Sequence, residues 1–126
     1  MNNFIKYWVP PILWAGLIFF LSSLANLRFE FLSTWDLILR KIWHMFEYAI
    51  LAILFIRLGR SKIKSKSSAV YMAALIGVVL YSITDEWHQS YVLGRVGSVM
   101  DVAIDTAGGL IGATIHYLVK YRKFKA

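Results

Sequence analysis

Two long stretches without a charged residue constrain the fold more than any other feature of this sequence. Residues 7–27 and 67–84 contain no Asp, Glu, Lys or Arg. Each stretch is close to the ~20 apolar residues that a helix needs to cross the ~30 Å hydrocarbon core of a bilayer. Two further runs, about 42–58 and 99–119, are apolar with embedded polar residues, and 59% of all residues are hydrophobic. The sequence therefore predicts an integral membrane protein.

We expect an all-α membrane protein with four transmembrane helices joined by short loops. The predicted spans are about 7–25, 41–59, 68–86 and 99–119, and a chain of 126 residues forms one domain, 1–126. An alternative is that Ser23-Leu24-Ala25 ends a cleaved secretory signal, which would leave three spans. Pro10-Pro11 instead favours the start of a helix there. The absence of cysteine excludes disulfides and thiolate metal sites.

The distribution of positive charge predicts which side of the membrane each segment faces. With four spans, the N-terminus, residues 61–68 and the C-terminal tail share one side, which holds ten of the 14 basic residues: Lys6, Arg57, Arg60, Lys62, Lys64, Lys66, Lys120, Arg122, Lys123 and Lys125. The other side holds Arg28, Arg40, Lys41 and Arg95. Because Lys and Arg stay cytoplasmic, both termini are predicted inside. The net charge of +7 is then a topology signal that also attracts anionic membrane lipids, and no nucleic-acid partner is expected.

The acidic residues lie on or near the opposite side. They are Glu30, Asp36, Glu47, Asp85, Glu86, Asp101 and Asp105. An aspartate facing hydrocarbon at mid-helix costs at least ~2.5–3.5 kcal/mol by insertion scales, so it is retained only where partners or water receive it. We therefore expect the acids to line an outward-facing pocket between the helices.

Helical spacing places further polar residues on the same inward faces. Residues three and four apart share a helix face, and the groups with this spacing are His44, Glu47 and Tyr48, then Tyr81, Asp85 and His88, then Asp101 and Asp105. Gly108-x-x-x-Gly112 continues the last stripe and lets a neighbouring helix approach closely. Arg95 is the natural partner for the acids, because a guanidinium can bridge carboxylates.

The motifs H-x-x-E-Y and DEWHQ-x5-R-x2-S-x2-D-x3-D-x2-G resemble the VanZ-like family, small bacterial membrane proteins named for a teicoplanin-resistance determinant. The resemblance covers about residues 8–118, a single VanZ-like transmembrane domain. The family's recurring polar positions correspond to Lys41, His44, Tyr48, Asp85, Glu86, Gln89, Arg95, Ser98 and Asp101. The resemblance implies a multi-pass protein of the bacterial cell membrane with a role in glycopeptide tolerance.

The acids and histidines also suggest candidate site residues. Candidates for acid–base catalysis are Asp85, Glu86, His88 and Asp101. Candidates for substrate binding are His44, Glu47, Tyr48, Gln89, Arg95, Ser98 and Asp105. No metal site or cofactor is predicted, although carboxylates could hold a divalent cation.

Four functions stay open on these residues. The pocket could bind a lipid-linked cell-wall precursor or a lipoglycopeptide, or it could modify a lipid-linked envelope substrate as a hydrolase or transferase. It could also serve an ion-coupled carrier, for which four helices would need to form a homo-oligomer. In the last alternative the polar residues form a network that only fixes helix register.

Overall fold

The computed structural model describes residues 2–24, 34–63, 67–92 and 97–125, which form four α-helices and no strand. The helices are α1 (Asn3–Leu24), α2 (Thr34–Lys62), α3 (Ser67–Ser90) and α4 (Val99–Lys125). Each contains a stretch that is long and apolar enough to cross a membrane. The prediction of an all-α chain with four such helices is confirmed.

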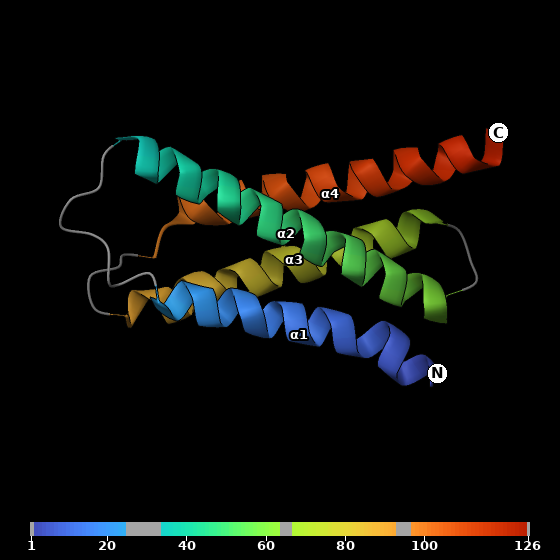
Figure 1. Cartoon of the computed structure of the whole chain (residues 1–126), viewed down its shortest axis with the longest axis horizontal. Coiled ribbons are helices and arrows are strands. Elements are labelled where there is room, and N and C mark those ends of the chain that lie inside the picture. Colours follow the sequence, from blue (N-terminus) through green and yellow to red (C-terminus); the bar gives the residue numbers. More distant parts are fainter. Residues whose placement is uncertain (1, 25–33, 64–66, 93–96, 126) are drawn as a thin grey trace.

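The four helices run alternately in opposite directions along one bundle (Figure 1). The start of α1, the end of α2, the start of α3 and the end of α4 lie at the same end, which we call the terminal end. The opposite end, where α2 and α4 begin, is called the acidic end. Helix α2 packs against the three others, whereas the backbones of the described parts of α1 and α4 are not adjacent.

The helices extend beyond the apolar runs from which they were predicted. Helix α2 begins at Thr34 rather than at about residue 41, and α3 continues to Ser90 rather than ending at about 86. Backbone hydrogen bonding does not require apolar side chains, so polar residues prolong a helix beyond the hydrocarbon core. At ~1.5 Å per residue, a helix the length of α2 is longer than the ~30 Å core.

Pro10-Pro11, which favoured a helix start, do not begin α1. Both prolines lie inside the helix, which begins at Asn3. Asn2 caps it, because its Oδ1 accepts the Phe4 N–H at 3.2 Å and its carbonyl accepts the Lys6 N–H at 3.1 Å. An asparagine cap satisfies donors that the first turn leaves unpaired, and this fixes the start ahead of the prolines.

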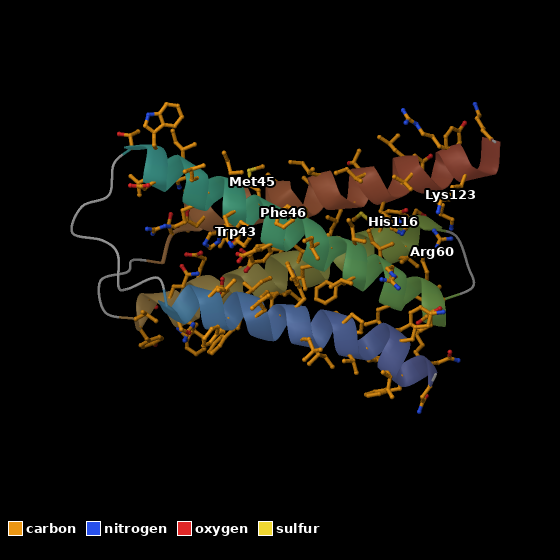
Figure 2. The ribbon with its side chains drawn as sticks, viewed as in Figure 1. Trp43, Met45, Phe46, Arg60, His116 and Lys123 are labelled. Carbon is orange, nitrogen blue, oxygen red and sulfur yellow. The ribbon has the colours of Figure 1, made fainter. Side chains whose placement is uncertain are left out.

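Helices α2 and α4 approach closely through glycine. A Cβ atom added at Gly108 would collide with the backbone of Met45, and one added at Gly112 would collide with the backbone of Ala49. As predicted, Gly108 and Gly112 therefore form a small-residue packing surface. Figure 2 labels Met45 on the α2 side of this contact.

Helix α1 is joined to α2 and α3 by hydrogen bonds as well as by apolar packing. The Trp14 indole N–H donates to the Glu47 carbonyl at 2.9 Å, and the Tyr81 hydroxyl donates to the Ala15 carbonyl at 2.5 Å. The side chain of Ile18 is buried against Tyr48 and its neighbours in the core. These contacts position α1 over the polar residues described next.

Candidate functional site

Polar side chains from all four helices are buried in the half of the bundle nearest the acidic end. The buried ones are Ser22, Glu47, Ser82, Asp85, Glu86, Gln89 and Asp105. Together with their contacts Lys41, His44, Tyr48, Ser98 and Asp101 they are called the polar cluster. Because an ionisable residue in a membrane-spanning helix is costly, such a cluster is a candidate functional site.

Asp105 joins three helices. Its side chain is fully buried, with a relative exposure of 0%. The Ser82 hydroxyl of α3 donates to Oδ2 at 2.7 Å, and Nδ1 of His44 in α2 faces Oδ1 at 3.2 Å. Both carboxylate oxygens are thus occupied, which is how a buried acid is accommodated.

Asp85 joins α2, α3 and α1. Its Oδ2 accepts hydrogen bonds from the Tyr48 hydroxyl at 3.2 Å and from the Gln89 amide at 3.1 Å. The same amide nitrogen donates to the Ser22 hydroxyl of α1 at 2.5 Å. Asp85 Oδ1 is also buried, but it has no hydrogen-bond partner among the described residues.

Glu86 binds the start of α4. Its Oε2 accepts the backbone N–H of Ser98 at 3.0 Å, and the Ser98 hydroxyl accepts the Met100 N–H at 3.1 Å. A Cβ atom at Gly97 would lie 2.5 Å from the Glu86 carbonyl oxygen, so this approach of the chain requires glycine. Ser98, predicted as a substrate-binding residue, is thus the cap of α4.

Lys41 and Asp101 form the most exposed contact of the cluster. Lys41 Nζ lies 3.1 Å from Asp101 Oδ1, and the side chains are 47% and 33% exposed. An exposed ion pair contributes little to stability, typically ~0.2–1 kcal/mol. The pair is accessible to solvent, unlike the buried carboxylates of the cluster.

His88 packs against α1, whereas Glu47 is buried within the polar cluster. The His88 ring stacks on Phe19 of α1 with ring centroids 4.0 Å apart, and its buried Nδ1 has no partner among the described residues. Glu47 Oε1 is likewise buried without a described partner. Gln89, and not His88, is the residue that contacts Asp85. Arg95 lies outside the described residues, and its contact with the acids stays a prediction.

The polar cluster is rich in acceptors. Three buried carboxylate oxygens have no hydrogen-bond partner among the described residues: Glu47 Oε1, Asp85 Oδ1 and Glu86 Oε1. A buried acceptor without a donor loses the free energy of hydration that it had in water. N–H or O–H donors placed at these three atoms would recover that free energy. No three His, Asp or Glu residues in the described part of the chain are grouped so as to hold a metal ion.

Ser82, Asp105 and His44 are not arranged as a serine nucleophile with its base. Ser82, Asp105 and His44 are in contact, but the carboxylate lies between the hydroxyl and the imidazole. In a Ser-His-Asp triad the imidazole must contact the hydroxyl in order to take its proton. Ser82 is therefore a positioning residue for Asp105.

The sequence reasoning missed the roles of Ser22 and Ser82. Ser82 lies three residues before Asp85 and seven before Gln89, so its spacing placed it on the polar face of α3. Ser22 had no such signal, because the residues three, four and seven before it are Phe19, Ile18 and Ala15. Lys41 was noted in the family pattern but was not among the candidate site residues.

The fold and the polar cluster define a multi-pass membrane protein with ionisable residues buried between its helices. The sequence matches the family described as VanZ/LLP1 over residues 7–120. The chain belongs to this family, which confirms the resemblance seen in its motifs. No curated protein and no solved structure matched the chain.

Proposed function

We propose that this VanZ-like protein binds a lipid-linked envelope component or a lipoglycopeptide at the polar cluster and so contributes to glycopeptide tolerance of the teicoplanin type. The observation that carries the proposal is the set of three buried carboxylate oxygens without a described partner, on Glu47, Asp85 and Glu86. A ligand that supplies donors to them would replace the hydrogen bonds that burial removed.

Both ligand classes have the chemistry that this site needs. Lipid-linked precursors and lipoglycopeptides carry sugar hydroxyls, amide N–H groups and amines, and their lipid chains keep them in the bilayer. The polar cluster is built from helices long enough to span that bilayer. The Lys41–Asp101 pair at its edge is weak enough for a polar headgroup to displace.

We also propose that the acidic end faces the outer side of a bacterial cell membrane and that both termini are cytoplasmic. The supporting observation is that ten of the 14 basic residues lie in segments assigned to the side of the termini. Positive charge of this kind sets the orientation of membrane helices. The polar cluster would then lie on the outer side of the membrane, where envelope precursors and glycopeptides are present.

Binding can be tested with protein reconstituted in lipid nanodiscs. Teicoplanin and a lipid-linked precursor are titrated separately against the wild type, Asp85→Asn and Asp36→Asn. Asp36 is an exposed residue of α2, so its variant has the same chemical change outside the buried cluster. We expect Asp85→Asn to weaken binding roughly tenfold or more, the loss expected for one hydrogen bond to a charged group, and Asp36→Asn to leave it unchanged.

Drug susceptibility gives the cellular test at matched membrane levels of each protein. Wild type and Asp36→Asn should raise teicoplanin tolerance above that of cells lacking the protein, and Asp85→Asn should not. Equal binding and equal susceptibility for all three proteins would contradict the proposal and leave the polar cluster as a structural network.

A second candidate function is an enzyme acting on a lipid-linked envelope substrate. The observation that favours it is the contact between His44 Nδ1 and the buried Asp105 carboxylate. A carboxylate at Nδ1 orients an imidazole to exchange a proton at Nε2, as a general base does. Mass spectrometry of lipid-linked precursors distinguishes the two functions. A covalent change that requires the wild type and is lost in His44→Gln would favour the enzyme, whereas an unchanged precursor pool would favour binding.

A further inference from the structure

We propose that the terminal end of the bundle carries a phosphate-binding site centred on Arg60. The site is separate from the polar cluster and does not depend on the function proposed for it. Its ligand is a phosphate group, either in the headgroup of an anionic lipid or in a soluble phosphate compound.

Three helices meet at Arg60. The residue lies in the last turn of α2, where its guanidinium interacts with the Tyr71 hydroxyl of α3 and acts on the His116 ring of α4 through its charge. Tyr71 and His116 share a hydrogen bond of 2.7 Å between the hydroxyl oxygen and Nδ1. Figure 2 shows Arg60 and His116 at the same end of the bundle.

The Arg60 guanidinium has a donor that the described chain does not use. Its Nη1 is buried and has no hydrogen-bond partner among the described residues. A charged donor that is buried and unpaired costs more than a neutral one. A side chain that only extended toward water, as arginines at span ends often do, would place Nη1 in the solvent.

No side chain of this region can neutralise the charge. The sequence contains no Asp or Glu in residues 48–84 or 106–126, the segments that build this end of α2, α3 and α4. Other basic residues add positive charge near Arg60. Arg57 interacts electrostatically with His116. Lys120 lies four residues after His116 and Lys123 three residues after Lys120, so they share its face of α4. No acidic side chain of these segments can therefore pair with Arg60, which leaves its charge for an anion from outside them.

Phosphate is the anion that best fits this position. The planar guanidinium fork matches two phosphate oxygens at once. Arg60 lies near the end of an apolar membrane span, which is the level of the lipid headgroups. Basic pockets between transmembrane helices at this level can bind anionic headgroups, which supplies a ligand source without any further partner.

Native mass spectrometry of the detergent-purified full chain tests the site. Phosphatidylglycerol and phosphatidylcholine are added separately to the wild type, Arg60→Gln, Arg60→Lys and Arg122→Gln. Arg122→Gln removes the same charge from an exposed residue of α4 and is the matched control. Thermal unfolding of each variant verifies that it is folded, and Arg60→Lys retains the charge if Arg60→Gln does not fold.

The wild type should bind phosphatidylglycerol in preference to phosphatidylcholine, and Arg122→Gln should behave like it. Arg60→Gln should bind phosphatidylglycerol roughly tenfold more weakly, and Arg60→Lys should fall between the two, because it keeps the charge but not the fork. Addition of inorganic phosphate distinguishes a lipid ligand from a soluble one. If phosphate displaces phosphatidylglycerol, the site is assigned to a soluble phosphate compound. If phosphatidylglycerol stays bound, the site is assigned to a lipid. Equal losses in Arg60→Gln and Arg122→Gln, or no preference for the anionic lipid, would overturn the proposal.

Discussion

Asp105 in α4 and His44 in α2 face one another at 3.2 Å, beside a close backbone approach of these two helices. Gly108, one turn beyond Asp105, lies against the backbone of Met45, the residue after His44. The absence of a side chain at Gly108 thus brings the two helices close enough for the carboxylate and the imidazole to meet. The packing of Gly108 on Met45 and the contact of His44 with Asp105 therefore depend on one another. A substitution that alters one should alter the other.

The first prediction concerns the free energy of the His44–Asp105 contact. A double-mutant cycle with His44→Ala and Asp105→Ala should give a coupling of about 0.6–1.7 kcal/mol, the range found for hydrogen bonds between membrane helices. Unfolding in a denaturing detergent, followed by circular dichroism, measures it. His116 and Asp105 are not in contact, so a cycle between these two should be additive. The same coupling in both cycles would show that the pair has no direct interaction.

The second prediction concerns glycine packing between α2 and α4. Gly112→Ala places a methyl group against the backbone of Ala49, which cannot move as a side chain can. We expect the free energy of unfolding to fall by about 1–3 kcal/mol, the usual cost of overpacking. Gly16→Ala is the control, because a Cβ atom there meets nothing within 4 Å. Unfolding titrations of both variants measure the difference, and equal stabilities would contradict the close packing.

The number and type of helices were predictable from the sequence because each is built on a long apolar run. The ends of the helices could not be predicted in this way. Polar residues such as Asp36 and Gln89 extend a helix beyond its apolar run and leave no hydrophobic pattern to show it. The start of α1 depends on a single cap at Asn2, and the adjacent prolines gave a misleading signal. Local hydrogen bonding, which leaves little trace in composition, determines these boundaries.

The candidate site was predictable only to the level of a helix face. His88 and Gln89 lie three and four residues after Asp85, so both positions fit the polar face of α3. The neighbouring helix decides between them: Phe19 of α1 packs on His88, and Ser22 accepts a hydrogen bond from Gln89. Whether His88 or Gln89 contacts Asp85 therefore depends on how α1 is rotated about its axis where it packs on α3. The sequence of α3 alone does not specify this rotation.

The third prediction separates two roles of Ser98. If its hydroxyl acts as the cap of α4, Ser98→Ala should lower the free energy of unfolding by about 1 kcal/mol, and Ser98→Asp should restore most of it. If the Ser98 hydroxyl also donates a hydrogen bond to a ligand, Ser98→Asp should still weaken binding, because an ionised carboxylate can cap the helix but cannot donate. Unfolding titrations and nanodisc binding assays measure the two effects separately. A Ser98→Ala protein with unchanged stability would rule out the cap.

The fourth prediction concerns orientation in the membrane. The sequence has no cysteine, so a single introduced cysteine is the only thiol in the protein. Ser61 and Ser90 are exposed residues in the last turns of α2 and α3, at opposite ends of the bundle. With both termini inside, Ser90→Cys should react with a membrane-impermeant maleimide in intact cells, and Ser61→Cys should react only after permeabilisation. The reverse pattern would place the basic segments outside, against the expectation for positive charge, and would expose the phosphate site rather than the polar cluster to the cell exterior.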